Sequence, residues 1–462
     1  MDLKDRLVDL AEDVADVQPP VGLWDTEVRR RMRARRETLV VLVVAVLVVT
    51  GLLAGSWQAA QQPVPANPGG QTHLPDHFWS PSTWLPGTDE AGELGPLIAA
   101  MPARRGSWWG SSEGVVGVSA TTGEYRFLDL PDYAGQGMAL SPDGRLVAYW
   151  AVGATSEAAA ERPSVAAVSV YDTATGRVRR AEIPTAHGLM VLALSFVSND
   201  SLVAAFAHYQ YGQDEAPPAI GNSGMNAPSL YWRLGQPAPI RAPFLEQLSP
   251  VATPAINGDR FWSSWWVRKG SVLVDLAGEP VVHPLRRPRV NGARISQLPE
   301  GALSADGRRL AIVQSPRFSG RMPNSVAVYA LDTTRRTCCG LVDEVPDNAH
   351  TEAVLAWLDR DHVATIRWSD VSADSLGISS GMELASVDVA TGSSTRLSTF
   401  VAKHPGEAGD VGWTFATDLV ASPSTPGVEP PHPWDPRLTT GLVVMVMAGA
   451  ALVIRARRRH RG

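Results

Sequence analysis

The sequence predicts an all-β protein: a six-bladed β-propeller, rather than a seven-bladed one, between two transmembrane helices and with a short amphipathic helix at the N-terminus. Three observations predict this fold. Two uncharged apolar runs lie near the chain ends, two kinds of hairpin motif alternate between them, and a Pro-rich stretch separates each run from the hairpins.

The two apolar runs, residues 39–55 and 438–454, each hold 17 residues without a charge. A helix needs ~20 mainly apolar residues to cross a bilayer core of ~30 Å, so we expect transmembrane helices at 39–57 and 438–454. A cleaved signal peptide is the alternative for the first run, but a charged leader of 38 residues is too long for one. A buried helix of a soluble protein is the alternative for either run.

Arginines flank both runs on the side of the chain end. Basic residues beside a span stay in the cytoplasm, so both termini are expected there, in a plasma-membrane protein whose middle segment is extracytoplasmic. The same side chains are expected to contact anionic lipid head groups. They are Arg29, Arg30, Arg31, Arg33, Arg35 and Arg36 before the first run, and Arg455, Arg457, Arg458, Arg459 and Arg461 after the second.

Charge and cysteine content restrict the function classes further. The chain carries a net charge of −6 although residues 455–462 are strongly basic, so the segment between the runs is acidic. Phosphate binding needs a cationic face, and nucleic acid is therefore not expected as a partner. The two cysteines, Cys338 and Cys339, are adjacent and cannot close a long loop, so the fold must be stabilised by burial.

The first kind of hairpin motif places a turn before an apolar run, as in SPDGRLVAY at 141–149 and SADGRRLAIV at 304–313. Its Asp-Gly pair supplies the positive φ that a tight hairpin turn requires. The first apolar residues of the six copies are spaced 56, 59, 49, 53 and 56 positions apart. They are Leu146, Leu202, Phe261, Leu310, Val363 and Leu419.

The second kind of motif is a strand, a turn that usually carries Gly, and another strand. Two hairpins per period make a four-stranded unit, and such units bury their faces when they stack radially as propeller blades. Because the series opens with the second kind and ends with the first kind at 415–422, we expect one blade to be assembled from both chain ends. A β-sandwich or an irregular all-β fold is the alternative. The six copies lie at 118–127, 170–179, 231–240, 274–283, 329–338 and 387–396.

The SPDGRLVAY and SADGRRLAIV turns, each followed by a VYD-like strand, resemble the WD40-like (PD40) repeats of TolB-type bacterial propellers over residues 107–421. The resemblance implies a six-bladed β-propeller that binds a partner, seldom with catalysis of its own. The resemblance does not identify a ligand for this chain. The Gly-His and Trp-Asp dipeptides of true WD40 repeats are absent.

Residues 2–17 place Leu3, Leu7, Leu10, Val14 and Val17 at alternating spacings of four and three, which predicts an amphipathic helix. Two heptads cannot bury this stripe by themselves. Either a cytoplasmic protein covers residues 1–36, or the tail stays solvated. The tail, the arginines and the span resemble in layout the cytoplasmic ends of actinobacterial membrane proteins that work with extracytoplasmic-function sigma factors.

The expected domain order follows from these segments. It is a cytoplasmic tail (1–38), a transmembrane helix (39–57), a Pro-rich extracytoplasmic linker (58–106), the propeller (107–421), a second Pro-rich linker (422–437), a second transmembrane helix (438–454) and a basic cytoplasmic tail (455–462).

The sequence shows no carrier of catalysis, so we expect no catalytic, cofactor-binding or metal-binding residue. A Gly-x-Ser-x-Gly pattern occurs at 110–114 and 377–381, but a nucleophile elbow needs a strand, turn and helix in a parallel α/β sheet. His73 and His77 lie four apart, but Pro75 between them breaks the helix on which a zinc-binding pair would sit.

Two Trp-rich motifs are candidates for an aromatic platform that binds a sugar or peptide, with packing inside the blades as the plainer use. They are SWWG, with Trp108 and Trp109, and WSSWW, with Trp262, Trp265 and Trp266. We therefore expect a membrane-anchored propeller that binds or senses a protein, peptide or cell-envelope ligand and is not an enzyme. Signalling to a cytoplasmic partner such as a sigma factor is left open. The alternatives are an enzyme acting on cell-wall or secreted substrates and a structural envelope scaffold.

Overall fold

The computed structural model describes residues 70–157, 164–209, 229–242, parts of 255–401, and 412–459 without 432 and 434. The chain divides into two compact units, Pro63–His432 and the combination of Met1–Gln62 with Pro433–Gly462. The expected amphipathic helix at 2–17, the six N-terminal arginines and the first span at 39–57 lie outside the described residues.

The second unit contains helix α4 (Pro436–Arg459), which is 24 residues long. Proline suits the first helical position because its φ is already helical, and the Asp435 carboxylate accepts a hydrogen bond from the Arg437 N–H at 2.8 Å. Residues 438–454 and the arginines that follow them up to Arg459 lie in this helix. Within the part of the chain that the structure describes, no helix combines the length and the apolar character needed to cross a membrane.

The unit Pro63–His432 is built mainly from strands, which form six sheets of four or five strands. The first sheet has the order β28 (Thr414–Phe415), β3 (Leu97–Ser107), β4 (Gly110–Ser119) and β5 (Tyr125–Phe127). The second is β6 (Tyr133–Leu140), β7 (Leu146–Val152), β8 (Val165–Asp172) and β9 (Val178–Glu182). The third is β10 (Leu189–Ser198), β11 (Ser201–His208), β12 (Ser229–Arg233) and β13 (Ile240–Arg241).

Three further sheets and some short elements complete the unit. The fourth sheet is β14 (Ala255–Asn257), β15 (Arg260–Trp265), β16 (Gly270–Asp275) and β17 (Val281–Leu285), and the fifth is β20 (Gly301–Leu303), β21 (Arg309–Gln314), β22 (Ser325–Asp332) and β23 (Thr337–Glu344). The sixth is β24 (Thr351–Trp357), β25 (His362–Trp368), β26 (Met382–Asp388), β27 (Ser394–Val401) and β2 (His77–Trp79). The short elements are helix α3 (Thr88–Ala91), β1 (Leu74–Pro75) with β29 (Ser424–Thr425), and β18 (Arg289–Val290) with β19 (Ala293–Arg294).

The turn motifs form the expected hairpins for local chemical reasons. Between β6 and β7, the Ser141 hydroxyl donates to the Asp143 carboxylate at 2.6 Å and accepts from the Leu146 N–H at 2.9 Å. Ser304 repeats both bonds between β20 and β21. The residue after each Asp is a glycine with a positive φ, +73° at Gly144 and +67° at Gly307. Five first-kind motifs and all six second-kind motifs thus connect paired antiparallel strands.

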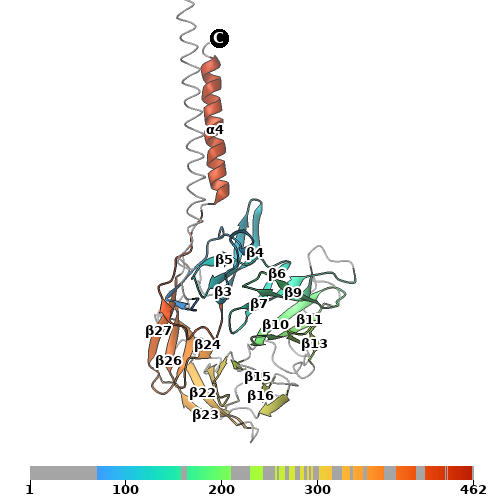
Figure 1. Ribbon diagram of the computed structural model, residues 1–462, viewed down its shortest axis with the longest axis vertical. Helices are drawn as coiled ribbons and strands as arrows, with labels where there is room; N and C mark the ends of the chain where they lie inside the picture. Colours follow the sequence, from blue (N-terminus) through green and yellow to red (C-terminus); the bar gives the residue numbers. More distant parts are fainter. Residues whose placement is uncertain are drawn as a thin grey trace, which may run out of the picture. The chain divides into compact units, whose positions relative to one another are not determined.

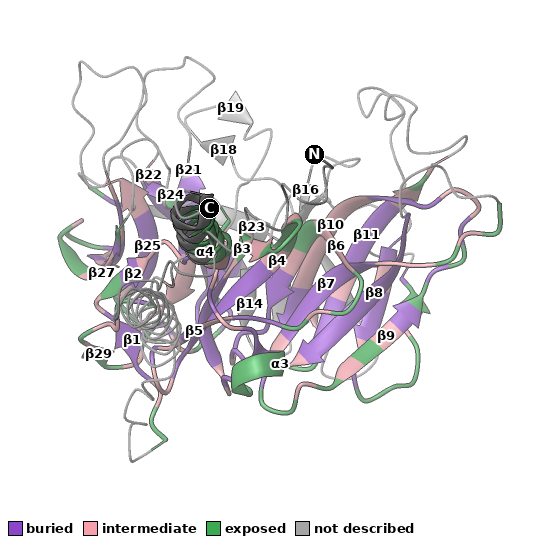
Figure 2. Ribbon diagram, turned by 90° about the horizontal axis from the view of Figure 1, so that it is seen from above, coloured by how far each residue is buried: buried purple, intermediate pink, exposed green. Residues whose placement is uncertain are grey.

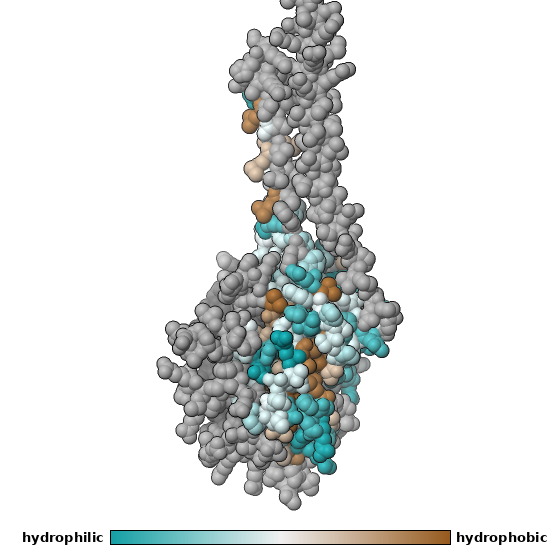
Figure 3. All heavy atoms as spheres, turned by 90° about the vertical axis from the view of Figure 1, so that its left-hand side faces the viewer, coloured by the Kyte–Doolittle hydropathy of each residue, from teal (hydrophilic) through white to brown (hydrophobic). Residues whose placement is uncertain are grey.

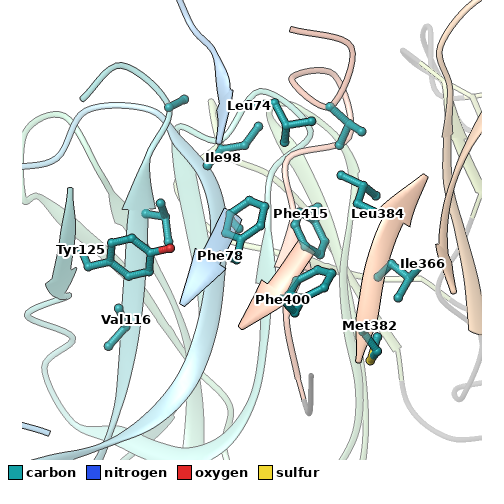
Figure 4. Packing of buried hydrophobic residues seen from close by; sticks show 14 of the residues in the cluster. Leu74, Phe78, Ile98, Val116, Tyr125, Ile366, Met382, Leu384, Phe400 and Phe415 are labelled. Carbon is teal, nitrogen blue, oxygen red and sulfur yellow. The ribbon is translucent and has the colours of Figure 1, made fainter. Parts of the chain in front are cut away.

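The sheets are the blades of a mainly-β propeller, as predicted (Figure 1). The first strand of each sheet contacts the first strand of the next, from β28 through β6, β10, β14 and β20 to β24. The last sheet packs against the first through an aromatic cluster, in which the rings of Phe78 and Phe400 and those of Phe78 and Phe415 lie 5.6 Å apart (Figure 4). Side-chain burial is described for most of five blades, and in the β14–β17 sheet only at a few positions.

The closing blade differs from the expectation in its composition. It does join both chain ends, because β28 pairs with β3 through Thr414–Ala100 and Phe415–Ala99. The expected hairpin at 415–422, however, is a single short strand followed by turns. The missing second strand is β3, which lies, except for its last residue Ser107, in the stretch that we expected to be a linker, 58–106. Its Pro content and its position before the first motif concealed it.

Two further pairings hold the ends of the unit together. β2 runs parallel to β27 as a fifth strand of the last blade, and β1 runs parallel to β29. Residues 70–106 and 422–425 therefore belong to the propeller, in contrast to the expected linkers at 58–106 and 422–437. Figure 2 shows the result: the strands are mostly buried along their middle, whereas α3 and many connecting segments are exposed.

Candidate functional site: the tip of the β3–β4 hairpin

The β3–β4 hairpin extends past the blade to which it belongs. The two strands pair with each other from Leu97–Ser119 to Ser107–Gly110. Their outer neighbours cover only the base: β28 pairs with residues 99–100, and β5 pairs with residues 116–118. Beyond that base the hairpin continues as a two-stranded ribbon, which projects from the blade in Figure 1.

Close contacts hold the flank of this ribbon. The Gly106 N–H donates to the Thr83 carbonyl at 2.7 Å. A Cβ at Gly106 would come within 2.8 Å of the Trp84 ring, so only glycine allows this approach. The Arg105 guanidinium lies 3.4 Å from the carboxylates of Asp89 and Glu90, both in α3. The ribbon is therefore held in place on one side almost to its end.

The end of the ribbon, which we call the Trp tip (residues 107–112), exposes two aromatic side chains. Trp108 and Trp109 are the two turn residues, with exposed fractions of 53% and 99%. Three serines flank them, Ser107, Ser111 and Ser112. Among the large hydrophobic side chains that the structure describes as exposed, these two are the only aromatic ones. The structure thus places the SWWG motif at an exposed loop, as the platform hypothesis requires.

The charges near the Trp tip balance each other. Arg104 and Glu113 face each other across the ribbon, with 3.7 Å between the guanidinium Nε and the carboxylate.

The neighbouring surface adds no further charge from Tyr133 in β6. Burial, together with the Glu113 carboxylate, raises the pKa of Tyr133 to about 12, so Tyr133 stays neutral at physiological pH. The face of the propeller seen in Figure 3 carries described hydrophobic residues in small patches among hydrophilic ones.

A second polar cluster lies where three turns meet. The Asp143 N–H donates to the Asn199 side-chain carbonyl at 2.9 Å, the Asn199 amide donates to the Asp418 carboxylate at 3.4 Å, and the Asp418 N–H donates to the Pro142 carbonyl at 3.0 Å. Partial burial raises the pKa of Asp418, and the nearby Asp143 carboxylate adds to the rise. The cluster joins the second and third blades to the closing segment, a structural role that accounts for its hydrogen bonds.

The first strands of the six sheets offer few groups for acid–base chemistry. Among their described residues, the only carboxylate is Glu352 in β24, and there is no histidine. General acid–base catalysis by carboxylates commonly uses two such groups with different pKa values. The described residues of these strands hold one such group, Glu352.

The other sequence candidates are separated in space or differ from the geometry they would need. Ser112 lies on the antiparallel ribbon, not at a strand–turn–helix elbow, and Ser379 of the second pattern is outside the described residues. His73 is buried, while His77 is exposed and lies 2.8 Å from the Asp76 carboxylate. Among the described residues, no group of three or more His, Cys, Asp or Glu side chains is placed to hold a metal ion.

The remaining candidates are only partly described. The backbone of Trp262 and Trp265 lies in β15, but their side chains and Trp266 fall outside the described part. Arg455 and Arg457–Arg459 form the last turns of α4. The ribbon that carries the Trp tip was not predicted from the sequence, although Gly and Ser residues on both sides of a short turn between two strands are a hairpin signal.

Comparisons with known proteins give similarities in fold. No family model matches the sequence, and no curated protein matches it either. The chain is similar to the structure of TolB from Acinetobacter baumannii, with 16% identity, a TM-score of 0.31 and coverage of 63% of this chain and 61% of that chain. It therefore spans less than two thirds of that TolB chain.

Two further solved structures have similar values. The β-propeller domain of the Trilobed protease from Pyrococcus furiosus is 11% identical, with a TM-score of 0.37 and coverage of 66% of this chain and 81% of that one. An oligogalacturonate lyase in complex with manganese is 11% identical, with a TM-score of 0.41 and coverage of 74% and 81%. These similarities concern the fold alone and carry no activity, ligand or partner.

Proposed function

We propose that this protein is a six-bladed, membrane-anchored propeller that works as an extracytoplasmic binding module and makes its contact through the Trp tip. The observation that carries the proposal is the 99% exposure of Trp109 at the end of a ribbon whose flank is held in place. A large aromatic side chain with no contact to its own chain buries substantial area only when a partner covers it.

The held flank supports a binding role. Gly106 packs against Trp84, and Arg105 pairs with α3, so the position of the tip is fixed before any partner arrives. Preorganised aromatic side chains lose little conformational entropy on contact, and Trp is enriched among residues that dominate binding energies.

Membrane anchoring is supported by the uncharged runs at 39–55 and 438–454 and by the arginines on their outer sides. A fusion test checks it. Alkaline phosphatase, which is active only outside the cytoplasm, is expected to be active when joined after residue 432. A fluorescent protein that folds only in the cytoplasm is expected to be bright when joined after residue 462. Reversed or equal signals at the two positions would refute the proposed topology.

A cytoplasmic partner at residues 1–36 is a second part of the proposal, supported by the apolar stripe from Leu3 to Val17. Replacing Leu7 and Leu10 by Asp is expected to release any protein that co-purifies with the chain through its tail. A purification in which the co-purifying proteins are the same with and without these substitutions would refute this part.

Contact at the Trp tip is tested by placing a photo-reactive amino acid at position 109 of the full chain in cells. An adduct at position 109 is expected, and its absence is expected for the same amino acid at position 240. Ile240 is the matched control because it is 49% exposed on β13, away from the ribbon. Equal reaction at both positions would refute the tip as the contact site.

A further inference from the structure

We infer that the partner of the Trp tip is the interfacial layer of a lipid bilayer. The inference rests on the proposed membrane-anchored binding function and names the occupant of the same site. Four features of the described residues support it: the size of the tip, its chemistry, its charge balance and the length of chain that follows the propeller.

The contact area of the tip is small. Its exposed surface consists of Trp108, Trp109 and three serines at the end of a two-stranded ribbon. A stable protein–protein interface buries ~1,200–2,000 Å² in total, whereas a single Trp buries ~150–250 Å². The tip alone is too small for such an interface, but a bilayer surface accepts single side chains of any spacing.

The chemistry of the tip matches the bilayer interface. Trp is enriched at the level of the lipid head groups because its ring is apolar while its indole N–H keeps a polar partner. Ser107, Ser111 and Ser112 supply small hydroxyl groups beside the rings. They add hydrogen-bonding capacity at that depth without adding bulk or charge.

The charge balance permits the approach. Arg104 and Glu113 face each other below the tip, and Arg105 pairs with Asp89 and Glu90 of α3, so each charged side chain of the ribbon lies beside an opposite charge. The carboxylate closest to the tip is thereby neutralised, and repulsion from anionic lipids, which a lone glutamate would cause, is reduced.

The chain that follows the propeller is short. Pro430 is the last buried residue that the structure describes in the propeller unit, and Leu438, which begins the uncharged run, follows it by eight positions. Eight residues span at most ~28 Å when fully extended. A propeller on so short a connection lies close to the bilayer if the run is anchored there.

The test uses the full chain purified into nanodiscs of phosphatidylcholine and phosphatidylglycerol, with the photo-reactive amino acid at position 109 or 240. After irradiation, lipid adducts are counted by mass spectrometry. Position 109 is expected to give at least about fivefold more lipid adduct than position 240, because we infer that the tip lies in the head-group layer, where Trp is enriched. Melting curves by circular dichroism check that both variants are folded.

The outcomes separate this inference from the proposed function. If position 109 gives no more lipid adduct than position 240, the inference that the bilayer is the partner is refuted. If position 109 then reacts in cells with a protein or a polymer, the binding function stands and only its partner changes. If the chain does not enter the membrane fraction of cells at all, the anchoring proposal fails, whatever the tip binds in nanodiscs.

Discussion

The second blade and the closing blade are built from the same kind of strands but from different parts of the chain. The second blade, β6–β9, uses one continuous stretch, Tyr133–Glu182. The closing blade takes β3, β4 and β5 from one end of the propeller sequence and β28 from the other. Local hairpins therefore suffice to define the second blade, whereas the closing blade exists only when distant segments meet.

This difference has an energetic side. Bringing distant segments together costs loop-closure entropy, so it must be offset by dense packing at the junction. The junction has that packing: Phe78, Phe400 and Phe415 come from three separate segments and have their rings 5.6–6.0 Å apart. Packing in the aromatic cluster therefore stabilises the fold and closes the ring of blades at the same time.

The largest effect is expected for Phe415→Ala compared with Phe206→Ala in the third blade. Both side chains are nearly fully buried, with exposed fractions of 4% and 3%, so each substitution should lower the free energy of unfolding by about 3–5 kcal/mol. Only Phe415→Ala removes packing between the chain ends. Limited proteolysis should therefore cut this variant first within 70–96 and 412–432. Equal cleavage patterns would mean that closure does not depend on the cluster.

The next largest loss of stability is expected for a glycine substitution in a turn that contacts the neighbouring blade, compared with one in a turn that does not. Gly144 has φ +73°, and a Cβ there would lie 2.0 Å from the Leu97 carbonyl of the closing blade. Gly123 has φ +72°, but its Cβ would lie 3.6 Å from Val428. Gly144→Ala should cost at least about 2 kcal/mol of unfolding free energy, and Gly123→Ala about 1–2 kcal/mol from the backbone alone. Urea denaturation measures both, and equal losses would show that the blades do not press on each other there.

Ser304→Ala tests a turn inside a continuous blade and should lower the free energy of unfolding by about 1–2 kcal/mol, because two hydrogen bonds are lost. The Ser304 hydroxyl and the Arg308 N–H hold the pKa of Asp306 below its ordinary value of 3.8. A depressed pKa contributes stability above pH 3.8, and that contribution is lost as the pH falls through the folded-state pKa.

The pH dependence of the stability difference between the wild type and Ser304→Ala is the control for this prediction. Because Ser304→Ala weakens the preference for the ionised carboxylate, the difference in stability between the wild type and the variant should shrink as the pH falls below 3.8. Denaturation series at neutral and at acidic pH measure this change. A difference that stays constant with pH would mean that Ser304 does not act through Asp306.

The smallest effect on stability is expected at the Trp tip. Replacing both Trp108 and Trp109 by Ser should change the free energy of unfolding by less than about 0.5 kcal/mol, because both side chains are exposed, with fractions of 53% and 99%, and surface substitutions usually change stability little. The same variant should lose contact with its partner. A large loss of stability would assign the two side chains to the fold and not to binding.

The sequence predicted the repeated hairpins because their information is local. The turn at 141–144, with Ser141, Asp143 and Gly144, and the turn from Asp172 to Gly176 determine their own backbone through side-chain hydrogen bonds and a positive φ. The strands β1 and β2 were not predicted, since each is defined by a partner far away in sequence, and β3 was not predicted although it forms a local hairpin with β4. Leu74 pairs with Ser424 and Phe78 with Phe400, and no local pattern encodes such a choice.

The candidate site was predicted in part for the same reason. The SWWG motif named Trp108 and Trp109 as candidates for a binding platform, and the structure shows that both side chains are exposed. Their exposure depends on whether the strands on either side of the ribbon continue to its end. Because β5 begins only at Tyr125 and β28 is two residues long, the ribbon loses its neighbours before the tip, and this could not be read from the motif.

Because the two ends of the propeller lie close together, the order of its strands along the chain can be changed by circular permutation. A Cβ at Gly123 would lie 3.6 Å from Val428 and 4.0 Å from His73, so the segment before β1 and the segment after β29 border the same residue. A short peptide that links these ends, with new termini opened between β9 and β10, would give a circular permutant. In that molecule the closing blade would be encoded by one continuous stretch, and its formation would no longer depend on the recruitment of a remote strand.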